Sequence, residues 1–156
     1  METWMITGVT GFLGPRVEAA LREKGEVEVL PMTREELNFT DQEQVKRVLG
    51  TLHPDVLVHA AAVSDTGACE RDPEGSWKVN VTGVEYLSKA CRENGTKLIF
   101  ASSDQVYTGS KIRTPHKETE ILKPANVYGR EKLEAEEIIA AQCPDGISLR
   151  LTWMYD

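Results

Sequence analysis

The segment Thr7-Gly8-Val9-Thr10-Gly11-Phe12-Leu13-Gly14 decides the fold, because it follows the apolar run Trp4-Met5-Ile6 and leads into a helical pattern. Glycines at a strand-to-helix turn permit a tight bend, close approach of a ligand to the backbone and close packing of the helix on the strand. Amide groups in the first turn of the helix would face the oxygens of a pyrophosphate. The residues predicted to bind that pyrophosphate are Gly8, Gly11, Phe12, Leu13 and Gly14.

The spacing of these glycines is Gly-x-x-Gly-x-x-Gly, whereas Gly-x-Gly-x-x-Gly is the more common pattern. A glycine-rich turn that binds nothing is therefore an alternative interpretation. The turn opens a unit in which a strand, a helix and a second strand follow one another, and this context favours a dinucleotide cofactor.

Short apolar runs alternate with longer amphipathic stretches along the rest of the chain. The expected strands are residues 4–6, 27–30 (ended by Pro31), 56–58, 98–100 and 147–151, and the expected helices are 12–24, one capped by Thr40-Asp41, 76–93 and 126–141. Residues 108–124 are polar with two prolines, and predict an irregular loop near the active site. The succession predicts an α/β fold of the Rossmann type, a doubly wound parallel sheet with helices on both faces.

Size and composition suit one globular domain, residues 1–156, with 40% hydrophobic and 28% charged residues. A formal charge of −7 argues against nucleic acid or an acidic membrane as a general partner. No apolar stretch reaches the roughly 20 residues that cross a bilayer, and no signal peptide is visible. Three cysteines without close spacing fit reduced thiols, and the histidines form no cluster with them. We therefore expect a cytoplasmic protein without a metal site.

The chain ends at Trp153-Met154-Tyr155-Asp156, directly after a strand expected in the interior of the sheet. Ligands of such sheets bind beyond the carboxyl ends of the strands, where a natural domain usually adds covering structure. We therefore expect a cofactor-binding domain that stops before a substrate-binding lobe.

The segment after the second expected strand bears on the choice of cofactor. An NAD-dependent enzyme usually offers an acidic side chain to the ribose hydroxyls at this place, but Leu30-Pro31-Met32-Thr33-Arg34 contains no acid. Arg34 could bind a 2′-phosphate, with Thr33 beside it. The segment therefore predicts NADPH in preference to NADH, and a solvated surface arginine is the alternative.

Tyr128 and Lys132 lie four residues apart on an expected helix, so they share one face. A free tyrosine has a pKa near ~10, and a neighbouring ammonium group should lower that pKa toward the working range. Ser103, at the end of the fourth expected strand, could hold a substrate carbonyl against the phenol. The pair is common by chance, but together with the glycine turn it predicts a proton-transfer site beside a hydride transfer.

These residues resemble the extended short-chain dehydrogenases/reductases, most specifically the dTDP-4-dehydrorhamnose reductase family. The resemblance runs through essentially the whole chain. It is carried by the glycine turn, Leu37-Asn38-Phe39-Thr40-Asp41, His59-Ala60-Ala61-Ala62, Val79-Asn80-Val81, Ser102-Ser103-Asp104-Gln105-Val106-Tyr107, Pro124-Ala125-Asn126-Val127-Tyr128-Gly129 and Leu149-Arg150-Leu151-Thr152-Trp153-Met154-Tyr155. Asp104 after the serine pair favours the reductase branch over sugar epimerases and dehydratases.

The resemblance implies NAD(P)H-dependent reduction of a 4-keto sugar nucleotide such as dTDP-4-dehydrorhamnose, within dTDP-rhamnose biosynthesis. Tyr128 would protonate the keto oxygen, Lys132 would bind the nicotinamide ribose, and Ser103 and Asp104 would complete the catalytic set. Asn38 and Phe39 would lie near the adenine, and Ala60, Ala61 and Ala62 would line the cofactor groove. A homodimer is left open.

Three features depart from the family pattern. Glu131 stands where a small hydroxyl residue usually precedes the lysine, Gln105 replaces a common tyrosine, and Val63-Ser64-Asp65-Thr66-Gly67 diverges. Two other functions remain open: a nucleotide-sugar epimerase or dehydratase of the same fold, and a non-catalytic NAD(P)-binding subunit like the β subunit of methionine adenosyltransferase.

Overall fold

Five parallel strands form one sheet in the order β2-β1-β3-β4-β5 in the computed structural model, which describes residues 1–111 and 113–155. Ile112, inside the expected loop, and Asp156, the expected last residue of the domain, lie outside the described residues. The strands are β1 (Glu2–Thr7), β2 (Val27–Met32), β3 (Val56–His59), β4 (Lys97–Ser103) and β5 (Ile147–Leu151). Met5 of β1 is paired with Leu30 on one side and with Leu57 on the other, which fixes the register at the centre.

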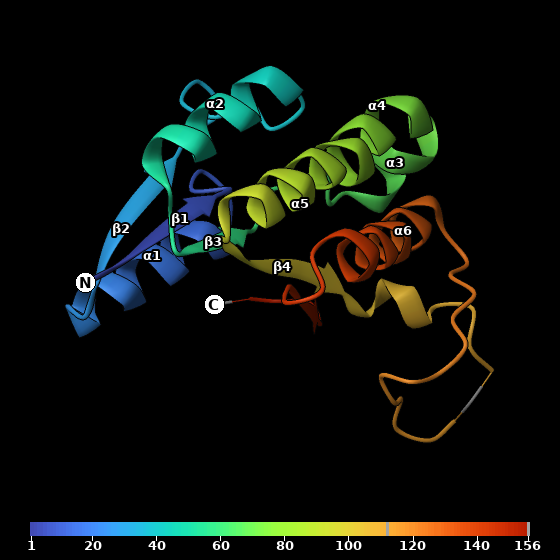
Figure 1. Cartoon of the computed structure of the whole chain (residues 1–156). Coiled ribbons are helices and arrows are strands. Elements are labelled where there is room, and N and C mark those ends of the chain that lie inside the picture. Colours follow the sequence, from blue (N-terminus) through green and yellow to red (C-terminus); the bar gives the residue numbers. More distant parts are fainter. Residues whose placement is uncertain (112, 156) are drawn as a thin grey trace.

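Helices connect the strands on both sides of the sheet (Figure 1). They are α1 (Leu13–Lys24), α2 (Gln42–Leu52), α3 (Thr66–Arg71), α4 (Pro73–Trp77), the π-helical segment η1 (Lys78–Thr82), α5 (Gly83–Asn94), the 3-10 segment η2 (Asp104–Tyr107) and α6 (Val127–Gln142). The predicted Rossmann-type fold is therefore confirmed.

Two hydrophobic cores occupy the two faces of the sheet, because successive strand residues point to opposite sides. Met5 belongs to the larger core, which α2, α5 and α6 cover. Ile6, the next residue, belongs to the smaller core, against which α1 packs with Val17 and Leu21. Helix α5 lies between α2 and α6 in Figure 1, and α6 contributes Tyr128 and Lys132 to the groove described below.

Most helix ends agree with the expectations. Asp41 caps α2 by accepting hydrogen bonds from the amides of Glu43 and Gln44, each at 3.1 Å. Gly25 and Gly95 end α1 and α5 in the left-handed conformation, with φ of 67° and 69°. Among the described residues, no helix is long and apolar enough to span a membrane.

The expected single helix over 76–93 differs from the structure. It begins earlier, at Pro73, where Asp72 accepts a hydrogen bond from the amide of Gly75, and it contains the π-helical segment Lys78–Thr82 before α5. Apolar periodicity does not reveal one extra residue in a turn. The six-residue helix α3 was also not predicted, since it is too short to show a period.

Two expectations about the strands were wrong. β2 continues through Pro31 to Met32, because β2 pairs only with β1 and an edge strand tolerates a missing amide donor. β5 pairs only with β4 and is an edge strand of this sheet, although we expected it in the interior.

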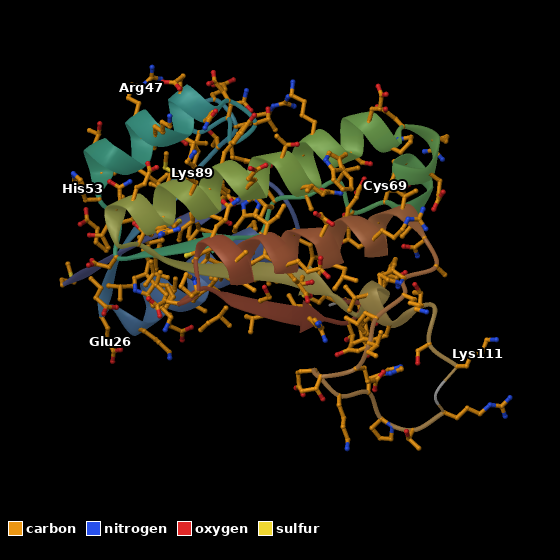
Figure 2. The ribbon with its side chains drawn as sticks, turned by 45° about the vertical axis from the view of Figure 1, so that its right-hand side comes forward. Glu26, Arg47, His53, Cys69, Lys89 and Lys111 are labelled. Atoms are coloured by element: carbon orange, nitrogen blue, oxygen red, sulfur yellow. The ribbon has the colours of Figure 1, made fainter. Side chains whose placement is uncertain are left out.

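The described part of residues 108–124 contains no helix or strand, as predicted, and it extends away from the sheet around the labelled Lys111 (Figure 2). Ring stacking of Tyr107 on His116, with 4.4 Å between centroids, connects it to η2. Its described residues do not line the pockets described below, and its expected place near the active site stays a prediction.

Candidate active site

A groove crosses the carboxyl ends of β1, β3 and β4. It consists of two adjoining pockets of about 310 and 270 Å³ that share Gly8, Thr10, Ala61 and Ala62. Fourteen of the predicted site residues line these two pockets. The first pocket contains Gly8, Gly11, Phe12, Leu13, Ala60, Ala61, Ala62, Ser103, Tyr128 and Lys132, and the second contains Thr33, Arg34, Asn38 and Phe39. Residues that lie 120 positions apart in the sequence, such as Gly8 and Tyr128, thus line one cavity.

The glycine turn is shaped by the absence of side chains. Gly8 has φ of 76°, and a Cβ on it would lie 2.7 Å from the carbonyl carbon of Ala60 and the nitrogen of Ala61. A Cβ on Gly14 would lie 2.6 Å from the carbonyl carbon of Gly8. Gly14 therefore faces the turn and not the groove: it permits the bend, while Gly11 and its neighbours line the pocket.

The N-terminus of α1 opens onto this pocket. Its N-cap residue, Phe12, makes no side-chain capping bond, and the first turn contains no acidic residue. The amide groups there are consequently available, and the helix dipole favours an anion. A turn that admits no Cβ, next to an uncapped helix, fits the pyrophosphate of a dinucleotide.

The second pocket is formed by the loop after β2. Arg34 is exposed at its edge, and Phe39 packs edge-on against the ring of His59, with centroids 4.8 Å apart. The amide and hydroxyl of Thr33 already donate to Glu36 Oε2 at 2.7 and 2.8 Å, and these hydrogen bonds lower the pKa of Glu36. Arg34 is therefore the cationic donor of this loop that remains for a phosphate.

Tyr128 and Lys132 lie on the first two turns of α6, which starts at Asn126. The Asn126 side chain accepts a hydrogen bond from the amide of Gly129 at 2.7 Å, which fixes the start of the helix. Both side chains are buried. Lys132 Nζ donates to the carbonyl oxygen of Ala101 at 2.9 Å and lies 5.6 Å from the centroid of the Tyr128 ring.

The predicted lowering of the Tyr128 pKa is not seen. Burial raises the pKa of Tyr128 to about 12, and the hydroxyl of Ser103 opposes this increase. Burial also lowers the pKa of Lys132 to about 8, opposed first by the charge of Glu131 and then by that of Glu136. Burial of the phenol is therefore the main reason that the Tyr128 pKa is not lowered, and the Lys132 ammonium group donates to the Ala101 carbonyl oxygen.

Ser103 ends β4, and Asp104 begins η2, so the change from strand to 3-10 helix places both beside Tyr128. They line a further cavity of about 500 Å³, together with Phe12, Gln105 and Met154. The Ser103 hydroxyl donates to Asp104 Oδ1 at 3.4 Å and accepts from the amide of Gln105 at 3.2 Å. A substrate carbonyl in this cavity would meet both the Ser103 and the Tyr128 hydroxyls.

His59 is buried and contacts Thr7 and Phe39, which line the second pocket. Its Nδ1 lies 2.7 Å from the Thr7 hydroxyl, and its ring stacks on Phe100 with centroids 6.0 Å apart. Burial, and secondly the charge of Lys132, lowers the pKa of His59 to about 3, so the ring is neutral. No group of three or more metal-binding side chains occurs among the described residues.

Several contributing residues were not predicted as site residues. Leu151, Thr152 and Met154 line the first pocket, and Glu131, Asn80 and Ser76 form a buried polar cluster behind Lys132. Glu131 was noticed only as a departure from the family pattern. A buried asparagine in the apolar run Val79-Asn80-Val81 is the one sequence signal that could have pointed to the cluster.

The fold and the side chains at this groove define a Rossmann-type domain of the extended short-chain dehydrogenase/reductase class. The chain belongs to the family described as RmlD substrate binding domain, whose model matches residues 2–156.

Individual relatives agree with this assignment. A dTDP-4-dehydrorhamnose reductase of Aggregatibacter actinomycetemcomitans is 33% identical over 99% of this chain and 52% of its own length. The solved dTDP-4-dehydrorhamnose reductase of Bacillus anthracis in complex with NADP superposes with a TM-score of 0.93 at 26% identity, over 99% of this chain and 54% of that one. The solved UDP-glucose 4-epimerase of Thermus thermophilus in complex with NAD superposes with a TM-score of 0.85 at 25% identity, over 95% of this chain and 54% of that one. The chain spans about half the length of the curated relatives it matches.

Proposed function

We propose that residues 1–156 are the cofactor-binding domain of an NAD(P)H-dependent reductase that acts on a 4-keto sugar nucleotide. The observation that carries the proposal is the first pocket, in which the glycine turn, Ser103, Tyr128 and Lys132 line one continuous cavity. The names of the relatives support the reductase chemistry, and dTDP-4-dehydrorhamnose is the substrate that we propose.

The groove residues divide the binding of the dinucleotide among them. The amides of Phe12 and Leu13 would bind the pyrophosphate, and Asn38 and Phe39 would contact the adenine. Gly11 lines the same pocket, but its amide donates to the Gly8 carbonyl oxygen at 3.0 Å and closes the turn. Arg34 would bind a 2′-phosphate, which makes NADPH the proposed cofactor. Thr33 lines the same pocket, with its amide and hydroxyl donated to Glu36. Ala60, Ala61 and Ala62 leave room along the wall because their side chains are small.

When bound, the nicotinamide supplies a hydride to the carbonyl carbon. Tyr128 donates its phenolic proton to the carbonyl oxygen, so that the ketone becomes an alcohol and the tyrosine a phenolate. Ser103 would hold the same oxygen, and Lys132, beside it in the pocket, would bind the nicotinamide ribose. Burial raises the pKa of Tyr128 to about 12, so the phenol carries the proton that this step requires at neutral pH.

Tyr128→Phe tests the proton donor in the native protein. It should lower turnover of the keto sugar nucleotide by about 10²–10⁴-fold and leave the dissociation constant for NADPH unchanged, since only the hydroxyl is removed. Tyr155→Phe, at a tyrosine that is 81% exposed, is the control. Turnover that survives in Tyr128→Phe would reject the assignment.

A second candidate is a nucleotide-sugar epimerase or dehydratase, which the superposition on a solved epimerase favours. Such an enzyme regenerates its cofactor, so one NADPH oxidised for each sugar nucleotide converted separates the reductase from it. A non-catalytic subunit would bind NADPH without turnover and would co-purify with a synthetase. Cytoplasmic location remains a proposal, supported by three free, buried cysteines, and a homodimer remains a prediction.

A further inference from the structure

Glu131 is a carboxylate in the interior of the protein. It is 1% exposed and precedes Lys132 on α6. A buried carboxylate is strongly unfavourable unless it is hydrogen-bonded or paired. Glu131 accepts hydrogen bonds from the Ser76 hydroxyl at 2.5 Å and from Asn80 Nδ2 at 2.7 Å, and no ion pair of its own occurs among the described residues. The carboxylate of Glu131 is therefore stabilised by two neutral hydrogen-bond donors and not by a salt bridge.

Asn80 extends the contact to the wall of the cofactor groove. Its amide nitrogen also donates to the carbonyl oxygen of Val63 at 2.9 Å, and its oxygen accepts from the Val63 amide at 2.9 Å. Val63 follows Ala60–Ala62 directly, and η1 is where the helix turns this asparagine inward. One carboxylate and one amide thus connect the helix of Tyr128 and Lys132 with the opposite wall of the groove.

The charge of Glu131 also acts on Lys132. The ionisable groups near Lys132 are Glu131, Glu136 and Tyr128 on its own helix, His59 on β3 and Cys69 on α3. Burial holds the His59 ring neutral and raises the pKa of the Cys69 thiol. Cys69 is labelled in Figure 2, in the region where α3 approaches α6. The two carboxylates are thus the groups that favour a charged lysine.

We propose that Glu131 is a positioning residue. Through Asn80 it sets the spacing between the Tyr128–Lys132 face of α6 and the groove wall at residues 60–63, and its charge keeps Lys132 protonated. The part of this proposal that concerns catalysis rests on the proposed reductase function. The spacing and the charge do not, and both can be measured without cofactor or substrate.

The charge is tested with Glu131→Gln, which keeps the size of the side chain and can still hydrogen-bond Asn80 and Ser76. The titration of Lys132 is followed by NMR in the chain with ¹³C-labelled lysine, assigned with Lys132→Met. The midpoint should fall by about one pH unit in Glu131→Gln and stay unchanged in the control Glu137→Gln, an exposed position of the same helix. An unchanged midpoint in Glu131→Gln overturns the charge role.

The spacing is tested by hydrogen exchange of the Val63 amide. Glu131→Ala removes the anchor of Asn80 and should speed this exchange by about tenfold or more, whereas Glu131→Gln should leave it near the wild-type rate. The amide of Leu57, in the centre of β3, reports whether the fold is intact. If Glu131→Ala unfolds the chain, Glu131→Thr replaces it. Unchanged Val63 exchange in a folded variant overturns the spacing role.

In the native enzyme, Glu131→Gln should lower turnover above the new midpoint of Lys132 and restore it below that pH. If the NMR and exchange results hold but turnover is absent in the wild type as well, the reductase proposal fails and the positioning role stands. If turnover is present and both physical readouts are unchanged, the positioning role fails alone.

Discussion

The two ends of the groove are built in opposite ways. At the glycine turn, backbone atoms and missing side chains make the site, and the turn forms because Gly8 accepts φ of 76° where no Cβ would fit. At the Tyr128–Lys132 end, buried side chains of α6 make the site, and Lys132 donates a hydrogen bond to the carbonyl oxygen of Ala101 in β4. A substitution should therefore damage the first end through steric overlap and the second through a change of charge.

The largest expected effect is a loss of stability at Gly8, and a comparison with Gly25 separates steric overlap of an added Cβ from the cost of a positive φ. Gly8→Ala places a Cβ 2.7 Å from the backbone of Ala60 and Ala61, whereas Gly25→Ala, also at positive φ, meets nothing within 4 Å. We expect Gly25→Ala to cost about 1–2 kcal/mol of unfolding free energy and Gly8→Ala about 3 kcal/mol or more, with loss of NADPH binding. Urea denaturation and NADPH titration measure both. Equal costs would show that overlap contributes nothing.

The contribution of the Tyr128–Lys132 end to the unfolding free energy should depend on pH. Lys132 has a pKa of about 8 in the folded chain and a higher one when unfolded, so between these values the unfolded state binds more protons and stability rises with pH. From pH 8 to pH 10 Lys132 should contribute an increase of about 2 kcal/mol to the unfolding free energy. The thiols of Cys69, Cys91 and Cys143 contribute in the opposite direction over this range, because burial raises their pKa values. Above pH 10 Tyr128, with a pKa of about 12 when folded, reverses the trend.

Lys132→Met is the matched variant for this pH dependence. Without the amine, this contribution should disappear, so the unfolding free energy of the wild type minus that of the variant should grow by about 2 kcal/mol from pH 8 to pH 10. The loss of the hydrogen bond to Ala101 lowers the stability of the variant at every pH. Urea denaturation at pH 7.5, 9 and 10 is the measurement. A variant that keeps the increase would mean that another group causes it.

The smallest expected effect concerns Arg34, at the rim of the backbone-built end. Arg34→Ala should raise the dissociation constant for NADPH about tenfold and leave that for NADH unchanged, since only NADPH carries the 2′-phosphate. Arg47→Ala, an exposed arginine on α2 labelled in Figure 2, controls for net charge. Equal affinity for NADPH and NADH in the wild type would remove the case for phosphate selection.

The same contrast explains what the sequence could predict. The glycine turn was predictable because its requirements are local: a strand, a bend without side chains and a helix start follow one another within residues 4–14. The residue types at the other end were predictable from the four-residue spacing of Tyr128 and Lys132. Their pKa values were not, since these depend on burial and on where Lys132 points, and only the packed structure fixes both.

Glu131 is the clearest example of this limit. In the sequence it is one more acidic residue on an acidic helix, and its neighbours Ser76 and Asn80 lie more than fifty positions away. Only the packing of α4 and η1 on α6 brings the three together. Similarly, the edge position of β5 could not be inferred from its apolar pattern.

The π-helical segment Lys78–Thr82 changes which face of the helix points toward the core. An α-helix advances each residue by about 100° around its axis, so one additional residue in a turn rotates everything beyond it by the same angle relative to everything before it. Upstream, Ser76 faces α6, and downstream, Val84 and Leu87 face the main core. Deleting a single residue here would restore a regular α-helix. Ser76 could then face Glu131, or Val84 and Leu87 could face the main core, but both could not hold at once.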